Sequence, residues 1–227
     1  MKALQERLPA YTVFAAVLSG AGLPIYIYAP KYYADTFGVS LTAIGTLLFA
    51  VRLFDIILDP VLGWISERLN RSKKIATTAA AVMMAVSMIC LFAVAPPIPP
   101  IWWFGITVTG LFTAFSFLTI NFYAQGVSKA GDDPQGHVRL AAWRESGALL
   151  GVCIAAIVPT VLIGIVGNPF AVLAYGFAAL TLIAAVFMWP EWKARVNQEP
   201  AYIGEIIRDN TARKLLILAL VNATPLA

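Results

Sequence analysis

Three ionisable residues, Arg52, Asp55 and Asp59, stand in the middle of an apolar segment that runs from about residue 41 to residue 65. At 100° per residue of a helix, their side chains fall within about a 60° arc of one face. Each charge at membrane depth costs roughly 2.5–3.5 kcal/mol on insertion scales. We therefore expect this face to turn away from lipid, toward protein or water.

Two interpretations of these charges remain open. Arg52 and Asp55, at positions i and i+3, can neutralise each other and only hold neighbouring helices in place. Asp59 lies one turn beyond Asp55 and has no second cation near it in the sequence. Two close carboxylates repel each other unless a cation or a proton lies between them. This is the chemistry of a hard-cation site with oxygen ligands, or of a proton relay.

The composition is that of an integral membrane protein. Of the 227 residues, 60% are hydrophobic and 12% are charged, whereas soluble domains carry about 25% charged residues. The net charge of +4 does not predict nucleic-acid binding, because the basic residues lie at the ends of the predicted helices. We find no Gly-rich phosphate loop, zinc-ligand spacing or nucleophile motif, and expect neither an enzyme nor a bound cofactor or metal. Cys90 and Cys153 lie in apolar runs and are expected in the core.

Apolar spans of about 20 residues predict an all-α, polytopic fold. The expected transmembrane helices are 9–30, 41–65, 74–95, 101–126, 140–165 and 169–189, with a seventh begun at 212–227. The predicted domains are a six-helix bundle over 1–190, a cytoplasmic linker over 191–211, and the truncated start of helix 7 over 212–227. Gly and Pro residues at 20–24 predict a kink in the first helix.

The distribution of basic residues predicts the orientation. Apart from Arg52, every Lys and Arg except Lys31 falls in the termini and in alternate connections. The positive-inside rule therefore places the amino terminus in the cytoplasm.

A short motif follows the second predicted helix. Gly63, Glu67, Arg68 and Arg71 fit the pattern G-x-x-x-[DE]-R-x-x-[RK]. Gly63 would allow close helix approach, Glu67 would pair with basic groups, and the two arginines would cap helix carboxyl ends. A plain basic loop is the alternative. The motif resembles the signature of the major facilitator superfamily, where it forms part of the cytoplasmic gate.

Within that superfamily the sequence resembles the glycoside–pentoside–hexuronide:cation symporters, the melibiose permease-like family. The residues that carry the resemblance are Tyr32-Tyr33-Ala34-Asp35, the segment from Arg52 to Gly63, Asp132-Asp133, and Arg139-Leu140-Ala141-Ala142-Trp143-Arg144. The resemblance covers nearly the whole chain, but only the amino-terminal half of a family member. It implies the amino-terminal bundle of a twelve-helix major facilitator fold.

The resemblance also implies roles for matching residues. Asp55 and Asp59 would coordinate the coupling cation, sodium or a proton, and Ser116 would add a hydroxyl ligand. The implied substrate-binding residues are Ser19, Tyr26, Arg52, Thr119, Tyr123 and Arg144. Tyr26 could instead belong to an interfacial tyrosine belt.

Three positions depart from the family pattern. Ser19 and Thr119 stand where carboxylates are expected to bind sugar, which argues against a galactoside-type substrate. Leu58 stands where sodium-coupled members often carry Asn, which argues against sodium and favours a proton as the coupling ion, or no tight coupling. Arg144 and Glu145, expected near the inner end of the fifth helix, form either a gate ion pair or a substrate contact.

The implied function is secondary active transport in the bacterial inner membrane. The chain would carry a small polar, sugar-like or glycoside-like solute together with a cation, by alternating access. Its partners would be the solute and the lipid bilayer. The alternative is a non-transporting half-transporter that acts as a structural or assembly subunit of a larger membrane complex, or that associates with itself.

Overall fold

The computed structural model describes residues 7–131, 133–193, 214 and 218. All regular structure in these residues is helical, which confirms the all-α prediction. The chain divides into two compact units, Met1–Ala194 and Arg195–Ala227. The predicted linker and seventh helix fall almost entirely outside the described residues, so the predicted domain boundaries stay predictions.

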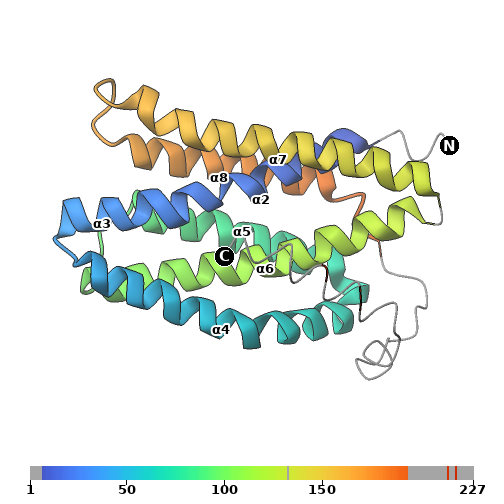
Figure 1. Cartoon of the computed structure of the whole chain (residues 1–227), viewed down its shortest axis with the longest axis horizontal. Helices are drawn as coiled ribbons and strands as arrows, with labels where there is room; N and C mark the ends of the chain where they lie inside the picture. Colours follow the sequence, from blue (N-terminus) through green and yellow to red (C-terminus); the bar gives the residue numbers. More distant parts are fainter. Residues whose placement is uncertain (1–6, 132, 194–213, 215–217, 219–227) are drawn as a thin grey trace. The chain divides into compact units, whose positions relative to one another are not determined.

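Six helical spans in the described part of the chain are long and apolar enough to cross a membrane. They confirm the six predicted spans, and Figure 1 shows their arrangement. The elements of the first span are α2 (Leu8–Gly20), a π-helical segment (Pro24–Tyr28) and α3 (Ala29–Phe37). The remaining spans are α4 (Leu41–Arg68), α5 (Lys73–Phe92, after a 3₁₀ turn Asn70–Ser72), α6 (Pro100–Ala130), α7 (Pro134–Leu162) and α8 (Pro169–Met188).

The predicted kink of the first span takes the form of a π-helical segment. The α-helix ends at Gly20, and Pro24 begins the wider turn that runs to Tyr28. Proline has no N–H to donate, and its ring clashes with the carbonyl one turn earlier, so it disturbs the regular hydrogen-bond ladder of a helix. Single π-turns of this kind are frequent at functional sites.

The helix α7 begins earlier than its hydropathy predicts. Pro134 occupies its first turn, and the Asp133 side chain accepts a hydrogen bond from the Gln135 backbone N–H at 3.1 Å. This cap and proline pair is a typical helix start. Arg144 is consequently about ten residues, or roughly 15 Å, from the start of α7. The expectation that it lies near the inner end of the helix is wrong.

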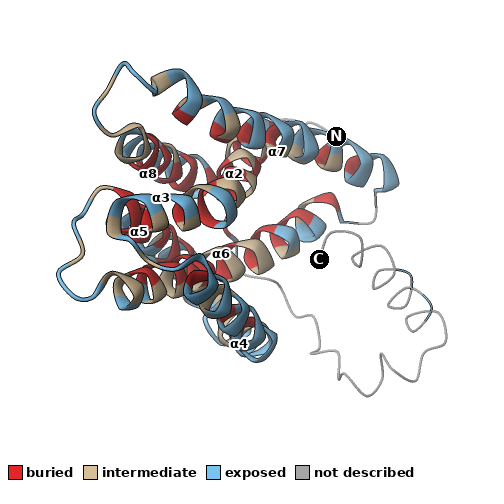
Figure 2. Ribbon diagram, turned by 60° about the vertical axis from the view of Figure 1, so that its left-hand side comes forward, coloured by how far each residue is buried: buried red, intermediate tan, exposed pale blue. Residues whose placement is uncertain are grey.

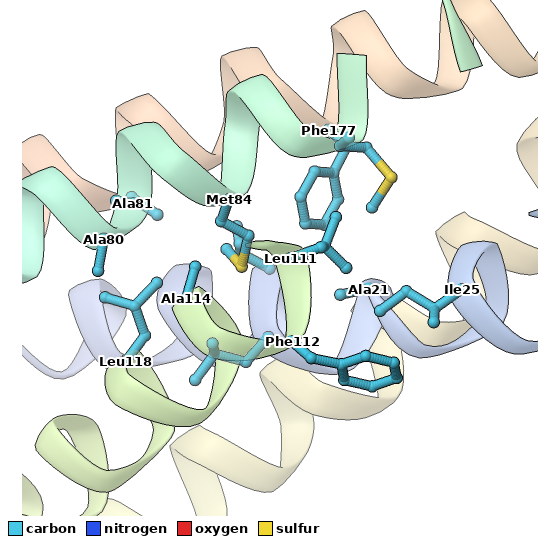
Figure 3. Close-up of a cluster of buried hydrophobic side chains, with 14 of the residues drawn as sticks. Ala21, Ile25, Ala80, Ala81, Met84, Leu111, Phe112, Ala114, Leu118 and Phe177 are labelled. Atoms are coloured by element: carbon cyan, nitrogen blue, oxygen red, sulfur yellow. The ribbon is translucent and has the colours of Figure 1, made fainter. Parts of the chain in front are cut away.

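Small residues bring α5 and α6 close together in the core. Ala80 of α5 points toward α6, where Ala114 and Leu118 lie, with the larger Met84 and Leu111 beside them (Figure 3). In lipid, where apolar burial gives little driving force between helices, close backbone packing of small side chains is a main source of association.

Two glycines of α7 make the closest helix contact. A Cβ atom at Gly147 would overlap the backbone carbonyl of Thr12, and one at Gly151 would overlap the carbonyl of Ala16. Their spacing of four residues places both on the side of α7 that meets α2. Gly63 was expected to serve this purpose, but no atom lies within 4 Å of the position its Cβ would occupy. That expectation is wrong for the described residues.

Two helices, α4 and α7, are the least buried of the six spans (Figure 2). The apolar window of α4 is 17% buried and that of α7 is 22% buried, against 44% for α5. A helix in lipid can expose apolar side chains freely, because acyl chains are as apolar as a protein core. Cys153 on α7 is accordingly exposed, and the prediction that it is a core residue is wrong.

Candidate functional site

One face of α6 organises the candidate site. Phe112, Ser116, Thr119 and Tyr123 follow one another at intervals of four, three and four residues, so they share a face, and Phe115 lies at its edge, three residues after Phe112. From the first to the last, this face extends about 16 Å along the helix. Helix α4 supplies a side chain to the Phe112 end of this face, and helices α2 and α7 supply side chains to the Tyr123 end.

Aromatic rings hold Arg52 at one end of this face. Its guanidinium carbon lies 4.7 Å from the centre of the Phe112 ring and 5.0 Å from that of Tyr26. These two rings are themselves 5.6 Å apart. Tyr26 belongs to the π-helical segment, so the irregular turn places this ring against Phe112. The cation–π contacts orient Arg52 while leaving about half of its side chain exposed.

The two aspartates of α4 occupy different environments. Asp55 is buried, with 6% of its surface exposed, whereas Asp59 is exposed. Arg52 Nη1 lies 3.5 Å from Asp55 Oδ2, and neither carboxylate oxygen of Asp55 has a hydrogen-bond partner among the described residues. The predicted Arg52–Asp55 pair thus exists, but it leaves the carboxylate poorly satisfied. A buried carboxylate in this state favours a proton or a cation as a further partner.

A cavity of about 120 Å³ lies at the other end of the face, between α2, α6 and α7. Four of the predicted substrate-binding residues line it: Ser19, Thr119, Tyr123 and Arg144. Thr119 Oγ1 is buried and has no hydrogen-bond partner in the described structure. Residues from three helices, up to 125 positions apart in the sequence, therefore meet in one polar cavity.

The charged pair of α7 also lines this cavity. The Arg144 guanidinium lies 4.4 Å from the centre of the Tyr123 ring. It donates two hydrogen bonds, of 2.9 and 3.0 Å, to Glu145 Oε1. The pair was predicted to be either a gate ion pair or a substrate contact. Because both residues line the cavity, the structure places a carboxylate on the same cavity as Ser19 and Thr119.

The remaining cation-site residue, Ser116, is half-buried on the face of α6 between Phe112 and Thr119. The described contacts do not join it to Asp55 or Asp59, and its role stays a prediction.

The signature motif lies at the end of α4. The Arg68 guanidinium stacks 3.9 Å from the centre of the Trp64 ring, while Glu67 and Arg71 are exposed. Within the described ranges, Glu67 makes no ion pair. The contact that joins this end of α4 to α6 is instead a hydrogen bond of 2.8 Å from Ser66 Oγ to Asn121 Oδ1.

A polar network around Glu191 was not anticipated from the sequence. Lys129 Nζ donates to Glu191 Oε2 at 2.6 Å, and the Tyr11 hydroxyl donates to the same oxygen at 3.4 Å. Arg7 Nε lies 3.7 Å from Oε1. The network ties the start of α2 to the end of α6 and to the segment after α8. Its only sequence signal is an acidic residue between Trp189 and Trp192 at the end of an apolar span.

The fold and the site together describe a polytopic helical membrane protein with a polar face inside one bundle. Comparison with known proteins specifies the family. The family model described as "MFS/sugar transport protein" matches residues 9–227. The chain therefore belongs to this family of the major facilitator superfamily, which confirms the resemblance found in the sequence.

Individual relatives are distant and longer than this chain. The inner membrane symporter YicJ of Escherichia coli (strain K12) is 24% identical over 186 residues, covering 78% of this chain and 40% of that protein. The raffinose permease of Escherichia coli is 26% identical over 55% of this chain and 31% of its own length. For the lactose permease of Klebsiella oxytoca, the identity is 25% over 71% of this chain and 38% of that permease. The matched part thus spans 40% or less of each relative's length. No solved structure matches the chain significantly.

Proposed function

We propose that this chain forms the amino-terminal, substrate- and cation-binding bundle of a symporter for a small polyhydroxylated solute. The observation that carries the proposal is the convergence of Ser19, Thr119, Tyr123 and Arg144 on one cavity. A cavity of about 120 Å³ is smaller than most ligand pockets, which range over about 300–1,000 Å³. We infer that a second bundle completes the site, as in transporters built from repeated halves.

The chemistry of the cavity suits a sugar or glycoside. Sugar hydroxyl groups both donate and accept hydrogen bonds, and Ser19 and Thr119 can do the same. The Arg144 guanidinium donates only, and the Glu145 carboxylate accepts only. The Tyr123 ring offers an apolar surface for the C–H face of a sugar ring. Glu145 therefore supplies from α7 the carboxylate that the positions of Ser19 and Thr119 lack.

The coupling ion, in this proposal, is a proton or a sodium ion at Asp55 and Asp59. On a helix, residues four apart have Cβ atoms about 5–6 Å apart, so a single cation can bridge both carboxylates. Binding neutralises the buried charge of Asp55 and weakens its pair with Arg52. Cation and solute then raise each other's affinity by the same factor, as thermodynamic linkage requires.

The proposed setting is the bacterial inner membrane, with the amino terminus in the cytoplasm. The basic connections support this orientation. They include Arg68 at the end of α4 and Arg71 in the 3₁₀ turn that follows.

The direct test is uptake of labelled glycosides, uronides and lysolipids by membrane vesicles that contain the full-length protein, with and without sodium or a proton gradient. Glu145→Gln should lower the uptake of the transported solute at least tenfold, through loss of the acceptor and of the pair with Arg144.

Asp35→Asn is the matched control for this variant. Like Glu145, Asp35 is an exposed carboxylate in a local ion pair, with Lys31 Nζ at 2.7 Å, but it does not line the cavity. Equal uptake by the two variants would remove Glu145 from the site. Uptake of lysolipid alone, or of no solute in any gradient, would overturn the proposed function.

A further inference from the structure

The Arg52 guanidinium has two kinds of neighbour that compete for it. The first is a pair of aromatic rings, those of Tyr26 and Phe112, whose centres lie 5.0 and 4.7 Å from the guanidinium carbon. The second is the Asp55 carboxylate, whose Oδ2 lies 3.5 Å from Arg52 Nη1. Neither oxygen of Asp55 accepts a hydrogen bond in the part of the chain that the structure describes. The arginine is therefore next to the carboxylate without bonding to it.

Only a small distance separates this arrangement from a hydrogen-bonded ion pair. Hydrogen bonds from a guanidinium to a carboxylate are usually about 2.7–2.9 Å long, so a shift of about 0.7 Å would bring Nη1 from 3.5 Å to 2.8 Å. Arg52 and Asp55 are three residues apart on α4, a spacing at which side chains of one helix reach each other. Something other than the spacing therefore holds the guanidinium away.

The two rings account for this separation. Phe112 is 2% exposed on α6, and its ring centre lies 5.6 Å from that of Tyr26. Tyr26 belongs to the π-helical segment Pro24–Tyr28, so two different spans supply the rings. A cation over two rings gains a free energy of the same order as one hydrogen bond between charged groups. The rings can therefore balance the attraction of the carboxylate.

We propose that Tyr26 and Phe112 form an aromatic clamp. As positioning residues, they hold the Arg52 guanidinium out of hydrogen-bond contact with Asp55, which leaves this buried carboxylate available to the coupling cation. Without the clamp, Arg52 bonds to Asp55 and takes the place of that cation. The role in cation binding rests on the proposed function, whereas the position of Arg52 does not.

The availability of Asp55 is measurable without a transport assay. Dicyclohexylcarbodiimide is an apolar reagent that modifies carboxyl groups at membrane depth, and a carboxylate bonded to a guanidinium reacts slowly with it. Peptide mass spectrometry of the full-length protein in detergent gives the rate of modification at Asp55. Phe112→Leu keeps an apolar side chain but removes the ring. It should slow the modification by about tenfold, the lower value for a hydrogen bond between charged groups.

A second pair of variants tests whether the clamp acts through Arg52. In an Arg52→Gln background, Phe112→Leu should change the rate by less than about twofold, because no guanidinium remains to bond to Asp55. Tyr26→Phe keeps the ring and should give the wild-type rate. If Phe112→Leu does not fold, Tyr26→Leu provides the test at a partly exposed position. The expected slowing is then about threefold, since one ring remains.

Phe104→Leu is the matched control. Phe104 is also a buried phenylalanine of α6, but its ring contacts Tyr33, at 4.9 Å between centres, and not Arg52. The control loses the same amount of side chain from the same helix, so it should cost stability without slowing the modification of Asp55.

Uptake by membrane vesicles measures the consequence for the cation. In Phe112→Leu, the concentration of the driving cation, sodium or protons, at half-maximal solute uptake should rise about tenfold. The uptake rate at saturating cation should stay within about twofold of the wild type, because the clamp acts on cation binding alone.

The two measurements separate the clamp from the proposed function. Equal rates of Asp55 modification in the wild type and in Phe112→Leu, or equal slowing by Phe104→Leu, would refute the clamp. Slowed modification together with uptake that depends on no cation would support the clamp and refute the proposed cation site.

Discussion

Two buried carboxylates, Asp55 on α4 and Glu191 after α8, have opposite surroundings. Glu191 is 9% exposed and accepts hydrogen bonds from Lys129 and Tyr11. Asp55 is 6% exposed, has its nearest cation at 3.5 Å, and accepts no hydrogen bond from the described residues. A satisfied buried charge suits a permanent scaffold, whereas an unsatisfied one suits a site that a proton or cation enters and leaves. Under the proposed function, the difference separates a structural acid, Glu191, from a cation-binding one, Asp55.

The largest expected effect comes from Asp55→Asn. We expect cation-dependent solute accumulation to fall at least 100-fold, because the amide cannot neutralise a bound cation. The melting temperature should stay the same or rise, since the variant removes a poorly satisfied buried charge. Vesicle uptake with and without each cation gradient, together with thermal unfolding, measures both. Unchanged cation-dependent uptake would refute the proposed cation site.

Glu191, the paired acid, should show the reverse pattern, with a loss of stability as the main effect of its substitution. Glu191→Ala leaves Lys129 nearly buried without its partner, and breaking a buried pair from one side costs about 3–5 kcal/mol of stability. Denaturant unfolding in detergent measures this loss, with Glu67→Ala as the exposed control. Lys129→Met combined with Glu191→Ala should recover part of it. A stable Glu191→Ala variant that does not transport would reverse the assignment of the two acids.

Substitution of Thr119, whose hydroxyl is unpaired, should affect transport more than stability, as for Asp55 but to a smaller extent. Thr119→Val keeps the shape of the side chain and removes a buried oxygen that lacks a partner, so stability should change by less than about 1 kcal/mol. The KM for the transported solute should rise about fivefold, the value of one hydrogen bond. A clear loss of stability with unchanged KM would indicate that this hydroxyl is structural.

The smallest effect is expected from Ser66→Ala, which removes the hydrogen bond to Asn121 between α4 and α6. The free energy of unfolding should fall by about 1 kcal/mol, and the KM should not change. Thermal unfolding and uptake kinetics give the two numbers. A changed KM would extend the solute site to the signature end of α4.

Hydropathy was sufficient to predict the six spans, because a helix in lipid must satisfy its own backbone and cover itself with apolar side chains. The predicted ends of the helices were less accurate than their number. Both α6 and α7 continue through polar residues, to Lys129 in one case and from Pro134 in the other, where caps and not hydropathy decide the boundary. Close helix approach was expected at Gly63, whereas Gly147 and Gly151 make the close contact with α2, since local spacing does not specify which glycine meets a partner helix.

By itself, the sequence determined the membrane class, the six spans, the family, and the presence of acids at membrane depth on α4. These properties depend on composition and on spacing within one helix. Only the tertiary structure decided that Ser19, Thr119 and Arg144 share a cavity, that Glu145 joins them, and that Glu191 is paired while Asp55 is not. Such contacts join residues that are distant in the chain, so they depend on which helix faces pack together.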